Sequence, residues 1–179
     1  MRTKIFYIFS FCFILSLLIH ITSILGLDVQ NKWVIAILSL GMFLALIFAG
    51  YYLHQNLNYL EYREKPFIKR LNPFKKIEII FSQIPTKLVL FTILLFCYCF
   101  FNFFYCLKTQ PYTPSIINNQ YVLHNHGTIE KILTIEEYHL ARAKELKLIS
   151  GHWMAFYGIA AVIIFTKKNN RLSKYLNLD

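Results

Sequence analysis

Four long stretches without a charged side chain constrain this sequence most. They cover residues 5–27, 33–53, 88–107 and 148–166, and each is long enough to cross the roughly 30 Å hydrocarbon core of a bilayer as an α-helix. A water-soluble fold would need polar sequence to cover them, but 56% of the 179 residues are hydrophobic and only 16% are charged. The sequence therefore predicts an all-α integral membrane protein built as a four-transmembrane-helix bundle.

The first stretch follows Arg2 and Lys4, a basic start that secretory signal peptides also have. Its apolar run is longer than that of a typical signal peptide, however, and no cleavage site of the A-x-A kind follows it. We therefore expect a retained membrane helix rather than a cleaved leader.

The distribution of basic residues predicts the orientation. Most of the 19 Lys and Arg residues fall in the N-terminus, the loop 54–87 and the tail after the last span, which a four-span chain places on one side. Because cytoplasmic loops are enriched in Lys and Arg, we expect both termini to be cytoplasmic, in a bacterial-type inner (plasma) membrane. The net charge of +10 then reflects this topology and contact with the lipid bilayer, and nucleic acid is not expected as a partner.

The cytoplasmic loop 54–87 has a pattern of its own. Asn72 and Pro73 suit the start of a helix, and apolar residues then recur at helical spacing as far as Ile84. This pattern predicts an interfacial amphipathic helix over about 73–84 that lies in the headgroup plane. Its role is either that of a connector lying on the lipid or that of a docking helix for a partner.

The outer loop 108–147 is too long for a simple connector, so we expect it to carry structure of its own. Residues 121–124 and 128–133 flank a turn sequence, Asn125-His126-Gly127. Apolar and β-branched residues on both sides of such a turn predict a small β-hairpin, with Gly127 at a positive φ.

A helix is expected to follow the hairpin. Thr134 and Glu137 have the spacing of a capping box, in which each side chain accepts a hydrogen bond from the other residue's backbone amide. The helix would run over about 135–148 and lead through Ser150-Gly151 into the last span. The expected fold thus includes a small outer β-hairpin-plus-helix cap between helices 3 and 4.

Most of the six histidines fall on the predicted outer side, and four of these are candidate metal ligands: His124, His126, His139 and His152. Neutral imidazole is the commonest metal ligand in proteins, so these side chains could converge on a haem or a transition metal. No HExxH, paired CxxC or Cys/His cluster accompanies them, and the alternative is that they are polar loop residues. No cofactor is therefore predicted outright, and haem or a transition metal remains the alternative.

No catalytic residues are predicted. The spans contain none of the charged side chains that mark pumps and proton relays, and His20 and Asn102 are among their strongest polar groups, which suits hydrogen bonds between helices. All four cysteines fall inside the spans, where thiols usually behave as small apolar side chains. Because GxSxG, Walker and dinucleotide-binding motifs are absent from the sequence, an enzyme is not favoured.

Small residues predict how two of the spans pack. Gly41, Ala45 and Ala49 are four residues apart in the second span, and Gly151 and Ala155 have the same spacing in the fourth. Further small residues follow in the fourth span: Gly158, Ala160 and Ala161. Such ridges let helix backbones approach closely in a membrane. We expect the second and fourth spans to touch along these residues, within one bundle or across an oligomer.

These patterns favour a non-enzymatic interaction protein. It would act through its helices and its outer loop on another membrane or envelope protein, or on a second copy of itself. An accessory subunit of an envelope complex and an immunity-type protein that neutralises a membrane-active toxin both fit this description. The alternative is a metal- or haem-handling membrane protein that uses the outer histidines.

Overall fold

The computed structural model describes residues 2–29, 31–55, 62–67, 71, 72, 78, 81 and 84–165. Its elements in chain order are α1 (Arg2–Ile24), α2 (Lys32–His54), α6 (Thr86–Thr109), β1 (Thr113–Ile117), β2 (Gln120–Asn125), β3 (Thr128–Ile132) and α7 (Ile135–Phe165). All four of these helices are long and apolar enough to cross a membrane, as the sequence predicts. The interfacial helix expected over about 73–84 lies almost wholly outside the described residues.

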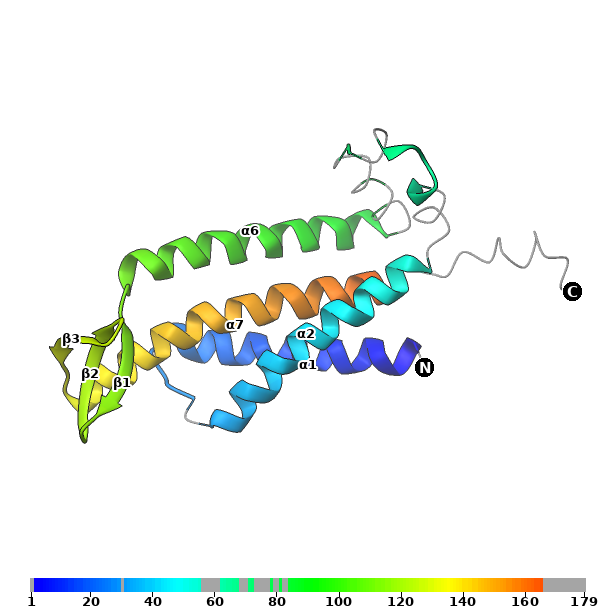
Figure 1. The fold of residues 1–179 in the computed structure, drawn as a ribbon. Coiled ribbons are helices and arrows are strands. Elements are labelled where there is room, and N and C mark those ends of the chain that lie inside the picture. The colour runs from blue at the N-terminus through cyan, green and yellow to red at the C-terminus, as the bar shows by residue number, and fades with distance from the viewer. Residues whose placement is uncertain are drawn as a thin grey trace, which may run out of the picture.

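The last helix, α7, is the centre of the fold. It packs against α1, α2 and α6, whereas these three helices pack little against one another. In Figure 1, α7 accordingly runs between α6 and the pair α1 and α2. In the most apolar 18-residue stretch of α7, 61% of the residues are buried, against 17–22% in the corresponding stretches of the other three helices. The hydrophobic core therefore follows the length of α7, with Trp153 and Tyr157 among its fully buried side chains.

The bundle has two unlike ends (Figure 1). The start of α1, the end of α2, the start of α6 and the end of α7 lie together at one end. The three strands and the connection between α1 and α2 lie at the other, which we call the sheet end. The four helices thus alternate in direction along the chain, as four successive crossings of one layer would.

The strands form an antiparallel three-stranded sheet in the order β1-β2-β3. The expected hairpin is the β2–β3 part of this sheet. The hairpin itself is confirmed: Asn125 of β2 pairs with Thr128 of β3, and Gly127 has a φ of 91°. The additional strand β1 joins β2 through Asn118-Asn119, with φ values of 50° and 62°. Asparagine tolerates this left-handed region better than most residues, which permits the tight turn.

The capping box at the start of α7 is confirmed. The Glu137 amide donates to Thr134 Oγ1 at 3.2 Å, and the Thr134 amide donates to Glu137 Oε2 at 2.9 Å. From there α7 continues unbroken through Ser150-Gly151 for 31 residues, so the expected outer helix and the last span are one helix. At 1.5 Å per residue it is about 46 Å long, which is more than the roughly 30 Å thickness of a hydrocarbon core.

Candidate functional site

A buried hydrogen-bonded group joins three helices near the sheet end. His20 of α1 lies between Ser150 of α7 and Tyr98 of α6, with 2.9 Å from Nδ1 to Ser150 Oγ and 2.5 Å from Nε2 to the Tyr98 hydroxyl. His20 is 2% exposed and Ser150 is completely buried. We call these three residues the His20 cluster.

The hydrogen-bond directions in the His20 cluster follow from Ser150. Its hydroxyl donates to the carbonyl of Leu146 at 2.7 Å, so its oxygen is left to accept. His20 Nδ1 therefore carries the proton and donates to Ser150, while Nε2 accepts from the Tyr98 hydroxyl. Every polar atom of the imidazole is satisfied, which is the arrangement expected of a buried polar group.

Asn102 extends this contact between α6 and α7. Its Nδ2 donates to the carbonyl of Lys147 at 3.1 Å, and its Oδ1 accepts from Cys106 Sγ at 3.6 Å. The close approach needs Gly151, because a Cβ there would lie 2.7 Å from Asn102 Nδ2. His20 and Asn102 thus bond other helices, whereas the Thr92 hydroxyl in the same bundle donates to Leu88 of its own helix.

The chemistry open to the His20 cluster is limited by its burial. A serine beside a histidine is the arrangement of a nucleophile and its base. Here, however, the Ser150 hydroxyl already donates to a backbone carbonyl, and no surface of the residue is accessible. The cluster is therefore best understood as a polar link that sets how α1, α6 and α7 pack.

The four histidines considered as metal ligands lie in different surroundings. His124 is in β2, and its Nδ1 is buried with no hydrogen-bond partner among the described residues. His126 occupies the β2–β3 turn at a φ of 47°. His152 lies midway along α7 and donates from Nδ1 to the carbonyl of Leu148 at 2.8 Å. In the part of the chain that the structure describes, no three His, Cys, Asp or Glu side chains are grouped to hold one ion.

The fourth of these histidines connects the sheet end to the bundle. His139 Nδ1 lies 3.2 Å from Asp28 Oδ2, in the connection between α1 and α2. The Asp28 side chain is only 7% exposed, and its other oxygen has no partner within the described ranges. Protonation of His139 would turn this contact into an ion pair. The pair therefore ties the α1–α2 connection to the outer part of α7.

The small residues of α2 lie against α7, and large side chains of α7 fill the space that they leave. Ala45 is 0% exposed and Ala49 is 5% exposed. The Tyr157 hydroxyl of α7 reaches α2 beside Gly41 and donates to the carbonyl of Leu38 at 2.7 Å. A Cβ at Gly41 would collide with that hydroxyl.

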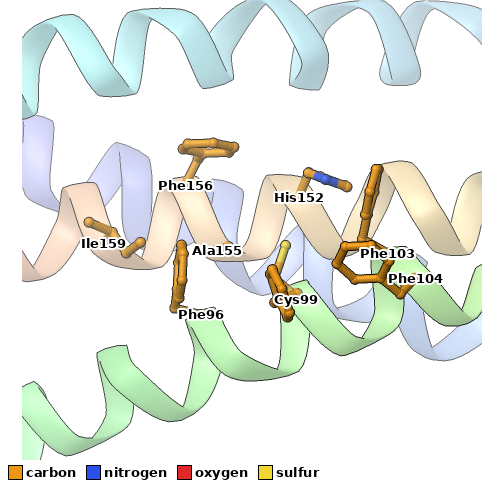
Figure 2. A pocket seen from close by; sticks show the side chains of 9 residues that line it. Phe96, Cys99, Phe103, Phe104, His152, Ala155, Phe156 and Ile159 are labelled. Carbon is orange, nitrogen blue, oxygen red and sulfur yellow. The ribbon is translucent and has the colours of Figure 1, made fainter.

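Two of the small residues of α7, Gly151 and Ala155, face other helices than we expected. Gly151 lies against Asn102 and His20, which belong to α6 and α1. Ala155 lies beside the phenylalanines of α6 (Figure 2). Gly151 and Ala155 therefore do not lie against the small residues of α2, whereas Ala160 and Ala161, further along α7, belong to the same core as Ala45 and Ala49. Larger side chains pack against Gly41 and Gly151 instead. Helix surfaces pack closely when small residues on one helix oppose large ones on the next.

Compared with known proteins, the chain matches no family model, no curated protein and no solved structure. The function is therefore argued from the exposed surfaces of this chain. Two surfaces are the most informative: the exposed strand β3, and the line of contact between α6 and α7.

Proposed function

We propose that this protein is a multi-pass protein of a bacterial-type inner membrane, with both termini in the cytoplasm. Large apolar side chains on the outward surfaces of the helices support this, for example Phe11 at 65%, Trp33 at 79% and Phe101 at 71% exposure. Such surfaces are unfavourable in water and suited to lipid. The excess of Lys and Arg in the N-terminus and the loop 54–87 supports the cytoplasmic side for the end opposite the sheet.

Within that membrane we propose that the protein is a non-enzymatic interaction protein, such as an accessory subunit or an immunity-type protein. The observation that carries this proposal is strand β3. All five of its residues are exposed, and among the residues that the structure describes it is an edge strand, paired with β2 on one side. An edge strand offers unpaired backbone amides and carbonyls, to which an extended segment of another protein can add as a further strand.

The side chains of β3 favour a different protein over a second copy. A symmetric antiparallel pair centred on the middle of β3 would bring Glu130 opposite Glu130 of the other chain. Like charges in that position are destabilising. Glu130 has no Cα partner in β2, because β3 has a bulge between Ile129 and Lys131. Ile129 and Ile132 are 47% and 61% exposed and would supply apolar contacts to a partner strand. The proposed partner is therefore an extended segment of a membrane or envelope protein on the outer side.

Photo-crosslinking tests the β3 surface. A photoreactive amino acid placed at Ile132 is expected to form one adduct in intact cells, and mass spectrometry should map it to an extended stretch of one membrane or envelope protein. The same amino acid at Ile116 is the matched control, because Ile116 is 58% exposed on β1, the opposite edge of the sheet. It should form no such adduct.

A charge on β3 should weaken this adduct. Ile129→Asp is expected to lower the yield about tenfold, since interface residues that matter contribute on the order of 1–2 kcal/mol. Ile116→Asp should leave the yield unchanged. Equal effects of the two substitutions, or an adduct formed only with a second copy of the chain, would contradict a partner at β3.

The proposed orientation has its own test. Reporter fusions at residue 125, in the sheet, and at residue 70, in the loop 54–87, are expected to report opposite compartments, with residue 70 in the cytoplasm. The physical reason is the excess of Lys and Arg on the side that carries residue 70. A fusion pair that reports the same compartment for both residues would contradict the four-span topology.

A further inference from the structure

A second surface follows the contact between α6 and α7. One half of it is an apolar groove of about 280 Å³, far from the strands. Five phenylalanines line this groove together with Ala155: Phe96, Phe100, Phe103, Phe104 and Phe156. Figure 2 shows Phe96, Phe103 and Phe104 on α6 and Phe156 on α7. We call this half the phenylalanine groove. No Lys, Arg, Asp or Glu side chain lines it.

A second hollow, of about 170 Å³, lies nearer the strands, and polar residues line it, among them Gln110, Tyr112, Lys144 and Glu145. The two hollows lie on the same face of α7. Leu148 lines the second hollow, and His152, Ala155 and Ile159 line the phenylalanine groove, at intervals of three or four residues. Such intervals place side chains in one row along a helix. The two hollows are neighbours along the contact between α6 and α7, and we call them together the seam. Its half nearer the strands is polar, and its other half is apolar.

The polar end of the seam has an uncompensated positive charge. Glu145 is paired with Arg142, at 2.5 Å between Oε2 and the guanidinium NH1. Lys144 has no ion-pair partner in the described part of the chain, and its side chain lines the seam. An occupant that carries a negative charge at this end would therefore be favoured.

We propose that this seam binds one anionic phospholipid, with its phosphate at Lys144 and an acyl chain in the phenylalanine groove. The change from charged to apolar along the seam matches the change along a lipid molecule. A transmembrane helix of a partner would meet Lys144 with apolar side chains, and a free anion would leave the groove empty. This inference needs the proposed membrane placement of the chain, but it is independent of a partner at β3.

Quenching by brominated lipids tests the proposal on the full-length protein in bilayers. Phe104→Trp places a fluorophore in the phenylalanine groove, and the signal of Trp33 and Trp153 is subtracted with the parent protein. The probes are phosphatidylglycerol and phosphatidylcholine with brominated acyl chains, each titrated into bilayers of unlabelled phosphatidylcholine. We expect half-maximal quenching at a brominated phosphatidylglycerol fraction about fivefold lower than that of brominated phosphatidylcholine. One lysine near an anionic headgroup contributes about 1 kcal/mol, which corresponds to this ratio.

Two charge variants assign that preference to the seam. Lys144→Gln in the Phe104→Trp background is expected to abolish the preference for the anionic probe. Lys108→Gln is the matched control: it removes the same charge near the sheet end of α6, but Lys108 does not line the seam. It should keep the preference. Equal loss in both variants, or no preference in the parent, would overturn the proposal.

Two further outcomes of the same experiment distinguish a lipid headgroup from free phosphate, and a failure of the lipid site from a failure of the membrane placement. Excess inorganic phosphate is expected to leave the quenching unchanged, because it cannot fill the phenylalanine groove, and its displacement of the probe would overturn a lipid site. A protein that enters bilayers but shows no headgroup preference would overturn the seam alone. A protein that fails to enter bilayers would contradict the membrane placement as well.

Discussion

Ala45→Phe is expected to separate α2 from α7 and to lower the free energy of unfolding by about 3 kcal/mol. Ala45 is 0% exposed and belongs to the core that surrounds α7. Within the same row of α2, a Cβ at Gly41 would already collide with Tyr157, so the space between these helices is full. A phenyl ring at position 45 can be accommodated only if the helices move apart.

The loss of stability is measured by heating the protein in detergent and then quantifying the folded fraction by size-exclusion chromatography. Leu40→Phe is the control on the same helix, because Leu40 is 66% exposed and a larger side chain there meets lipid or detergent. It should unfold at the temperature of the parent protein. If Ala45→Phe also unfolds at that temperature, the contact between α2 and α7 does not depend on the small residues of α2.

His20→Ala is the second substitution with a large expected effect, about 3 kcal/mol of lost stability. Two contributions add: the cavity left by a buried ring, and the loss of the hydrogen bonds to Ser150 and Tyr98. Hydrogen bonds between helices in membranes contribute only about 0.6 kcal/mol each on average, so the cavity is the larger contribution.

His20→Gln distinguishes the polar link from simple packing. A glutamine amide can donate to Ser150 and accept from Tyr98, as the imidazole does, so it should restore part of the lost stability. His152→Ala is the matched control, because in the described part of the chain the His152 ring donates within its own helix, to the carbonyl of Leu148, and the change should cost less than about 1 kcal/mol. Equal losses for His20→Ala and His152→Ala would show that the His20 cluster does not hold the helices together.

The central position of α7 connects the two surfaces proposed to be functional. One helix forms the core of the bundle, one wall of the seam and the support of the sheet. Its outer part also binds the α1–α2 connection through His139 and Asp28. A force on the sheet from a partner would therefore act on the same helix that lines the proposed lipid site.

The amino-acid sequence alone determined the elements that depend on neighbouring residues. The four long helices follow from uninterrupted apolar runs, the β2–β3 turn from Gly127, and the start of α7 from the capping box of Thr134 and Glu137. Each of these signals lies within one short segment of the chain, where the residue types and their spacing determine the local backbone conformation. The candidate β3 surface was indicated in the same way, as one strand of the expected hairpin.

Only the tertiary structure decided which helix is central and which polar groups meet. His20 and Ser150 are 130 residues apart in the chain, so no local pattern could pair them. Strand β1 was missed because its turn is Asn118-Asn119, without the glycine that marked the other turn, and α7 became the core because three helices converge on it. The small residues of α2 and α7 were found, but the large side chains that pack against Gly41 and Gly151 were not, because a row of small residues leaves space that only the folded chain fills.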